Sequence, residues 1–174
     1  DYSDLWLLRS DGGIDTDAVD TWCRKDASQW TLAVVQSIEA IGKRAEVDPE
    51  RIIVNGYSLG GFVALDATAQ LERSSTSPKA RGVVVNWGAR FETTSFPPDF
   101  PSTLFIHGEL DEVVPLDWAR RTCAEIQTAG NRAMLHVVPK APHVARSIES
   151  DELTIQFLKE CTANTSRQAP LVRN

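Results

Sequence analysis

The chain has 174 residues, of which 42% are apolar and 24% are charged. This length and composition fit one globular domain and exclude a collagen-like or largely disordered chain. Lys and Arg number 18 against 24 Asp and Glu, a net charge of −6 without a basic cluster, which argues against nucleic-acid binding. No apolar stretch reaches the roughly 18 residues that a membrane span needs.

Five short apolar runs are predicted to be strands. They are rich in Val, Ile and Leu and do not alternate with polar residues, which is typical of strands covered on both faces. In chain order they are Leu5–Leu8, Ile52–Val54, Val83–Val85, Leu104–Ile106 and Leu135–Val138.

Helical patterns separate most of these runs. Apolar residues recur at a spacing of three to four over about Asp26–Arg44, from Leu116 to Ile126, and from Ile148 to Cys161. Pro115 fits a first helical turn, and Gly130 follows as a stop signal. Strands that alternate with helices predict an α/β fold, with a mainly parallel sheet of about five or six strands and helices on both faces. We expect one domain over residues 1–163 and a C-terminal tail over 164–174.

The cysteines and the N-terminus give weak hints about the compartment. Three cysteines, Cys23, Cys123 and Cys161, are too few and too scattered for a disulfide framework. Cys123 and Cys161 stand at apolar helical positions and are predicted to be small buried residues. This pattern favours a reducing compartment, hence the cytoplasm. Because residue 1 is Asp and not Met, we expect a processed, trimmed or incomplete N-terminus, with no signal peptide visible.

The strongest chemical signal is the segment Gly56-Tyr57-Ser58-Leu59-Gly60-Gly61, between a predicted strand and a predicted helix. A Gly-x-Ser-x-Gly pattern in that context is typical of a nucleophile elbow, where a sharp turn lifts the serine hydroxyl clear of the sheet. We expect the two outer glycines, Gly56 and Gly60, to relieve crowding. The Leu59 N–H would face a developing negative charge. The alternative is a glycine-rich turn with an incidental serine.

A serine nucleophile needs a base, and the sequence offers three histidines. His136 lies inside a strand run, and His107 ends one. His143 lies in a loop after the last strand, at the sheet edge where Ser58 is expected, so it is the candidate base. The alternative is an ordinary exposed loop histidine.

The base needs a carboxylate to orient it. Asp111 follows the strand run Leu104–Ile106 and is placed to project toward the His143 loop. Its rivals for this role are Glu109, Glu112 and Asp117. The order serine, aspartate, histidine along the chain is the order found when each residue follows a strand of such a sheet.

These segments together resemble the α/β-hydrolase superfamily, in particular its dienelactone-hydrolase-like and phospholipase/carboxylesterase (acyl-protein-thioesterase-like) branch. The resemblance covers about Asp26 to Cys161. It rests on Val47–Ile52, Gly56–Gly61, the run His107–Pro115 and Pro142-His143. It implies Ser58 as nucleophile, Asp111 as acid, His143 as base and the Leu59 N–H as one donor to the oxyanion.

The chain departs from this family before the elbow. Only 57 residues precede Ser58, too few for the several strands and the oxyanion loop that the family places there. Ser10–Gly13 is either a substitute oxyanion donor or a plain surface turn. Loss of one such donor costs about 10²–10³ in rate. The sequence therefore leaves open a minimal hydrolase, a fragment completed by another chain, and a degenerate member.

The segment Asn86–Ser102 between two predicted strands is too short for a lid domain, so we expect an open site. Tyr57 and Trp87 are candidates for the substrate cleft. Phe91 and Phe96, like Trp87, either line the cleft or pack under the loop.

The sequence thus predicts a serine hydrolase for small carboxylic esters or thioesters that needs no metal or organic cofactor. The rival prediction is a catalytically weak or inactive module, or half of a split enzyme, that acts through partner binding. The missing first half of the sheet would leave an open edge, which a homodimer partner or a second chain could cover.

Overall fold

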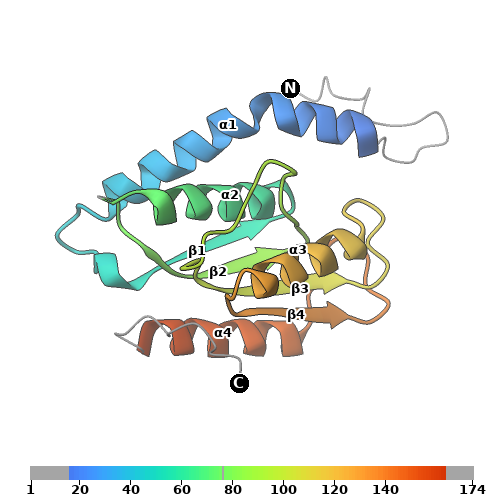
Figure 1. Ribbon diagram of the computed structural model, residues 1–174. Helices are drawn as coiled ribbons and strands as arrows, with labels where there is room; N and C mark the ends of the chain where they lie inside the picture. The colour runs from blue at the N-terminus through green and yellow to red at the C-terminus, as the bar shows by residue number, and fades with distance from the viewer. Residues whose placement is uncertain (1–15, 76, 164–174) are drawn as a thin grey trace.

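The computed structural model describes residues 16–75 and 77–163, which form a sheet with helices on both of its faces (Figure 1). The predicted strand Leu5–Leu8, the segment Ser10–Gly13 and the tail 164–174 lie outside the described residues. The described strands are β1 (Ile52–Tyr57), β2 (Ala80–Asn86), β3 (Ser102–Gly108) and β4 (Ala133–Val138). They pair in the order β1-β2-β3-β4, and every pairing is parallel. The predicted fold class is confirmed.

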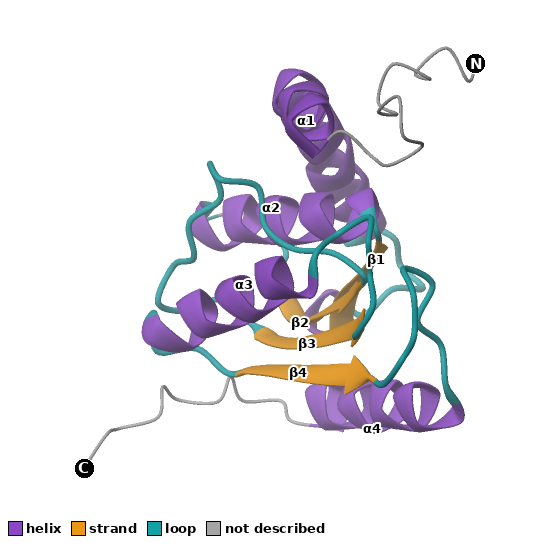
Figure 2. Ribbon diagram, turned by 90° about the vertical axis from the view of Figure 1, so that its right-hand side faces the viewer, coloured by secondary structure: helices purple, strands orange, loops and turns teal. Residues whose placement is uncertain are grey.

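The helices lie in layers around this sheet. They are α1 (Thr16–Ile41), α2 (Leu59–Arg73), α3 (Leu116–Thr128) and α4 (Ile148–Ala163), and a short 3-10 turn, Pro49–Arg51, leads into β1. Figure 2 shows α2 and α3 over one face of the sheet and α4 over the other, while α1 lies outside α2. The crossovers β1-α2-β2 and β3-α3-β4 therefore use the same face.

Both predicted ends of the helix before the elbow differ from those in the structure. We expected about Asp26–Arg44, whereas α1 runs from Thr16 to Ile41. The apolar residues at helical spacing begin only at Trp30. A helix can start before its first apolar residue, where no apolar face marks it in the sequence. At its other end, α1 gives way to turns after Ile41.

The other element predictions are closer. Each described strand extends its predicted run by two to four residues, because polar residues such as Asn86 continue the strand beyond the apolar stretch. Helix α3 begins directly after Pro115, and Gly130 follows its end with a φ of 88°. That φ lies in the left-handed region, where glycine has no steric penalty.

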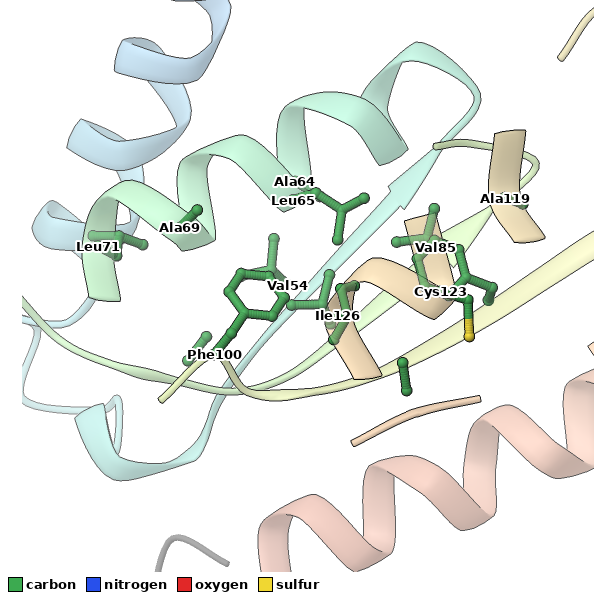
Figure 3. Close-up of a cluster of buried hydrophobic side chains, with 14 of the residues drawn as sticks. Val54, Ala64, Leu65, Ala69, Leu71, Val85, Phe100, Ala119, Cys123 and Ile126 are labelled. Atoms are coloured by element: carbon green, nitrogen blue, oxygen red, sulfur yellow. The ribbon is translucent and has the colours of Figure 1, made fainter. Parts of the chain in front are cut away.

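The main core fills the space between the sheet and helices α2 and α3. Side chains of one strand face, such as Val83 and Val85, meet Leu65 and Ile126 there. Figure 3 shows this cluster, in which Phe100 and Cys123 lie among the labelled side chains. Val84, Leu104 and Ile106 face the other way and pack with Phe157 under α4. Burial on both faces explains why these strands read as continuous apolar runs.

The two cysteines that were predicted to be buried are buried and free: Cys123 lies on α3 and Cys161 on α4. Burial raises the pKa of both thiols, that of Cys161 to about 11. Cys23 lies in the part of α1 whose side chains are not described.

Candidate active site

The carboxyl ends of the four strands meet at one edge of the sheet, and the chemically active side chains gather there. Tyr57, the last residue of β1, pairs with Asn86, the last residue of β2. Gly108 ends β3 opposite Val138 of β4. Because the strands are parallel and in register, the loops that follow them emerge side by side.

Ser58 occupies the sharp turn between β1 and α2. Its backbone has φ 52° and ψ −125°, a conformation that non-glycine residues rarely adopt. Its N–H donates to the Asn86 carbonyl at 2.8 Å, and its carbonyl accepts from the Gly61 N–H at 2.8 Å. These bonds hold the strained turn in place, and such strain is typical of functional positions.

The glycine requirement at this turn is strongest at Gly56. A Cβ on Gly56 would lie 2.1 Å from the carbonyl oxygen of Gly60, closer than any real contact. A Cβ on Gly60 would meet nothing within 4 Å. The expectation that both outer glycines relieve crowding is therefore correct for Gly56 and wrong for Gly60. The turn needs Gly56 because the first turn of α2 folds back onto β1.

Asp111 lies in the turn after β3, with its side chain fully buried. Its Oδ1 accepts the N–H groups of Val113 and Val114 at 2.9 and 2.8 Å. These bonds close the turn and aim the carboxylate inward, as is common for aspartate in loops. The carboxylate is thus buried, and its oxygens have the several hydrogen-bond partners that a buried polar group needs.

The three rival carboxylates are engaged elsewhere or exposed. Glu109 accepts the backbone N–H of Lys140 at 2.8 Å. Asp117 pairs with Arg120 at 2.9 Å on the surface of α3. Glu112 is exposed. Among the predicted candidates, Asp111 is therefore the carboxylate that the structure places against His143.

His143 lies between Asp111 and Ser58. Its Nδ1 is 3.0 and 2.9 Å from the two oxygens of Asp111, and its Nε2 is 2.9 Å from Ser58 Oγ. Because a carboxylate only accepts, Nδ1 carries the proton, and Nε2 is free to accept from the serine hydroxyl. The His143 side chain is 20% exposed, so the ring stays accessible from outside. We call this hydrogen-bonded series the Ser58–His143–Asp111 chain.

The His143 loop reaches this position because β3 ends in a glycine. A Cβ on Gly108 would lie 2.2 Å from the Pro142 carbonyl oxygen and 2.5 Å from that of Ala141. The N–H of Leu110 donates to the same Ala141 carbonyl at 2.9 Å. The loop after β4 therefore packs directly on the backbone at the end of β3.

The predicted cleft aromatics differ in their exposure. Trp87 is buried, its Nε1 donates to the Ala145 carbonyl at 3.1 Å, and its ring lies 6.1 Å from that of His143. Tyr57 is 53% exposed, and its ring lies 5.4 Å from that of Trp87 at a tilt of 50°. Phe91 packs on Phe62, so it lies under its loop. Tyr57 is thus the exposed aromatic beside Ser58, while Trp87 supports the His143 loop.

The start of α2 offers a place for negative charge. Leu59 is the first residue of this helix, and the first N–H groups of a helix have no partner within it. The positive end of the helix therefore lies beside Ser58. Within the described residues, no group of three or more His, Cys, Asp and Glu side chains is arranged to hold a metal ion.

A groove runs along the outer edge of β1, beside Ser58. Its volume is about 510 Å³. Its walls come from β1 and from the facing sides of α1 and α2: Trp30, Val34, Val54, Tyr57, Leu59 and Val63 line it, with four smaller or polar residues. Among the described strands, β1 pairs with β2 alone, so its outer edge faces this groove.

Sequence reasoning missed one residue of the site. His107 is the next-to-last residue of β3 and has a fully buried side chain, and its Nε2 lies 2.8 Å from the Val114 carbonyl oxygen and 3.1 Å from Asp111 Oδ2. It stands four residues before Asp111 in the sequence, a spacing that by itself predicts no contact. His136 lies on β4, and its buried Nε2 has no hydrogen-bond partner among the described residues.

The fold and the serine turn define the class of this protein, an α/β hydrolase. A family model for phospholipases and carboxylesterases matches residues 19–162, so the chain belongs to that family. This match confirms the suspected branch.

Solved structures agree on the fold. The α/β hydrolase MGS-M1 from a Medee basin deep-sea metagenome superposes with a TM-score of 0.66 at 16% identity, over 77% of this chain and 65% of that one. Esterase PE8 superposes with a TM-score of 0.65 at 21% identity, over 78% of this chain and 61% of that one. The Bacillus cereus carboxylesterase superposes with a TM-score of 0.64 at 13% identity, over 79% of this chain and 63% of that one. The chain thus spans less than two thirds of the length of these structures.

One sequence relative matches over a short stretch. The non-reducing polyketide synthase adrD of Penicillium roqueforti is 45% identical over 42 residues, which are 24% of this chain and 2% of that protein. Within residues 16–75 and 77–163, no helix is long and apolar enough to cross a lipid bilayer.

Proposed function

We propose that this chain is a serine hydrolase that cleaves carboxylic esters or thioesters through an acyl-enzyme intermediate. The observation that carries the proposal is the Ser58–His143–Asp111 chain, with 2.9 Å between Ser58 Oγ and His143 Nε2. A serine hydroxyl is a weak nucleophile, and a neutral imidazole nitrogen within hydrogen-bonding distance is the base that activates it. Membership of the phospholipase/carboxylesterase family supports the same chemistry.

In the proposed reaction, His143 Nε2 takes the Ser58 hydroxyl proton as Oγ bonds to the substrate carbonyl carbon. The carbonyl oxygen becomes an oxyanion, which the Leu59 N–H at the start of α2 stabilises. The tetrahedral intermediate collapses, and the leaving alcohol or thiol takes the proton from His143. Water then attacks the acyl carbon, His143 takes the water proton, and the bond to Oγ breaks as Ser58 recovers a proton.

Asp111 has two roles in this reaction. Its hydrogen bonds to Nδ1 hold the imidazole in the tautomer whose Nε2 can accept a proton. Its negative charge also stabilises the imidazolium formed while the proton resides on His143. The carboxylate does this at little cost in reorganisation, because two backbone N–H groups already fix it.

The substrate would approach from the side on which Tyr57 and the groove lie. Tyr57 is exposed next to Ser58, and the groove begins at Leu59 and Gly60. These surfaces suit a small ester or thioester with an apolar group. We assign the cleft role to Tyr57 and a supporting role to Trp87, whose indole is tied to the His143 loop.

A fluorophosphonate probe followed by intact-mass measurement tests the proposal, because such probes bond to an activated serine. We expect one adduct per chain in the wild type and none in Ser58→Ala, with both variants giving the same circular dichroism spectrum. A panel of esters and thioesters of graded length then defines the substrate. Full turnover of p-nitrophenyl acetate by Ser58→Ala would contradict the mechanism.

A second candidate function is partner binding through the outer edge of β1, along which no other described strand pairs. An edge strand with unpaired backbone groups can pair with the same edge of a second copy around a two-fold axis. Under this alternative, the wild type stays unlabelled by the probe and sediments as a dimer. A labelled monomer contradicts it.

A further inference from the structure

His107 is a buried histidine that touches the Ser58–His143–Asp111 chain without being part of it. Its side chain is fully buried at the end of β3. Its Nε2 lies 2.8 Å from the Val114 carbonyl oxygen and 3.1 Å from Asp111 Oδ2. Buried polar side chains need partners, and here both partners belong to the turn that carries Asp111.

The contact with Val114 shows where the proton of His107 resides. A backbone carbonyl only accepts, so Nε2 carries the hydrogen and donates it. The other nitrogen, Nδ1, is buried and has no hydrogen-bond partner among the described residues. Burial, together with the neighbouring His143, lowers the pKa of His107 against the opposing effects of Val114 and Asp111. His107 is therefore a neutral donor.

Val114 links His107 to Asp111 a second time. Its N–H donates to Asp111 Oδ1 at 2.8 Å, while its carbonyl accepts from His107. The backbone of Val114 is thus held by His107 at its carbonyl and by Asp111 at its N–H. Removing the histidine donor would leave a buried carbonyl unsatisfied and free the turn to shift.

The two oxygens of Asp111 differ in their support. Oδ1 accepts two backbone N–H groups, from Val113 and Val114. Oδ2 meets only histidine nitrogens within the described residues: Nδ1 of His143 at 2.9 Å and Nε2 of His107 at 3.1 Å. His107 is therefore the second group, besides His143, that faces Oδ2.

We propose that His107 is a positioning residue for the reaction: its Nε2–H holds Val114 and faces Asp111 Oδ2, so that the carboxylate stays aimed at His143. Neutrality suits this role, because a charged His107 would compete with the His143 imidazolium for the same carboxylate. The inference rests on the proposed hydrolase function for its kinetic consequence, but its geometric claim concerns Asp111 alone.

Two amide variants separate this role from a merely structural one. In His107→Gln the terminal nitrogen is as many bonds from Cβ as Nε2 is in histidine, so it can still reach Val114 and Asp111. In His107→Asn the same amide is one methylene shorter and falls near the position of Nδ1. Both variants bury the same polar group. His136→Gln, on β4 and outside the site, controls for the loss of a histidine.

We expect His107→Asn to lower kcat for p-nitrophenyl acetate about 10- to 100-fold with little change in KM, because small misplacements of reacting groups have effects of this size. His107→Gln should recover most of this loss, and His136→Gln should match the wild type. Thermal unfolding of every variant checks that each is folded. Folded His107→Asn with the kcat of His107→Gln would overturn the inference.

Proton NMR tests the geometric claim without any turnover. The proton between His143 Nδ1 and Asp111 should give a far-downfield resonance in the wild type and in His107→Gln, and it should be lost or broadened in His107→Asn. An unchanged resonance in His107→Asn overturns the inference. A wild type that shows this resonance but neither probe labelling nor turnover contradicts the proposed function and leaves the inference to be decided by NMR.

Discussion

Gly108 and Pro142 lie so close that a single methyl group would not fit between them. A Cβ built on Gly108 comes within 2.2 Å of the Pro142 carbonyl oxygen. Pro142 precedes His143, and Gly108 is followed by the turn that carries Asp111. The close approach of these two segments therefore sets the distance between the histidine and the carboxylate.

Gly108→Ala should disrupt this contact. The added methyl meets backbone and not a flexible side chain, so the His143 loop must move away from β3. We expect a loss of about 1–3 kcal/mol in the free energy of unfolding and a kcat lower by about 100-fold. Urea unfolding and p-nitrophenyl acetate kinetics measure the two effects.

Gly60→Ala is the matched control, since a Cβ there meets nothing within 4 Å and the residue is helical. Its free energy of unfolding should be unchanged or higher by up to about 1 kcal/mol. Equal stability of Gly108→Ala and Gly60→Ala would show that the close approach has no energetic consequence.

Asp111→Asn should lower kcat by about 10⁴, because asparagine keeps an oxygen for the Val113 and Val114 N–H groups but favours the wrong tautomer of His143. Steady-state kinetics and circular dichroism check activity and folding together. Glu112→Gln, which removes an exposed neighbouring carboxylate, should stay within about twofold of the wild type. Similar activities for the two variants would remove Asp111 from the proposed mechanism.

The stability of the wild type should fall as the pH drops below about 6.5, in part because of His107. Burial lowers the pKa of this histidine in the folded state. The unfolded chain, with its ordinary value near 6.5, therefore binds a proton that the folded chain resists. Stability from this source is complete above the unfolded pKa and is lost as the pH falls from that value to the lower pKa of the folded state.

His107→Gln cannot take up that proton. Between pH 7.5 and 5.5, its free energy of unfolding should therefore decrease less than that of the wild type, as measured by urea titration at each pH. The free energy of unfolding of each protein at pH 7.5 is the reference from which its decrease is measured. Parallel curves for the two proteins would mean that His107 is not held neutral by burial.

Cys123 and Cys161 should resist alkylation in the folded protein. Burial raises the pKa of both thiols, to about 11 for Cys161, so roughly one thousandth of Cys161 is thiolate at pH 8. A short iodoacetamide pulse at pH 8, followed by peptide mapping, should label both positions in guanidinium and neither in buffer. Equal labelling of Cys161 under both conditions would contradict the burial of α4 on the sheet.

Local patterns in the sequence determined much of the architecture. Apolar runs without alternation located the four described strands, because a strand buried on both faces shows that composition wherever it occurs. Gly56 and Ser58 between a strand and a helix marked the sharp turn, since that turn makes its own local steric demands. The start of α1 was missed because a helix can begin upstream of its first apolar face.

Tertiary structure decided what depends on residues far apart in the chain. The choice of Asp111 among four nearby carboxylates, the contact of His143 with Ser58 across 85 positions, and the burial of Trp87 arise only when the strand ends are brought side by side. The contact of His107 with Asp111 is close in sequence, yet no local pattern marked it. Its partners depend on how the turn folds back onto the end of β3, and that is set by packing, not by propensity.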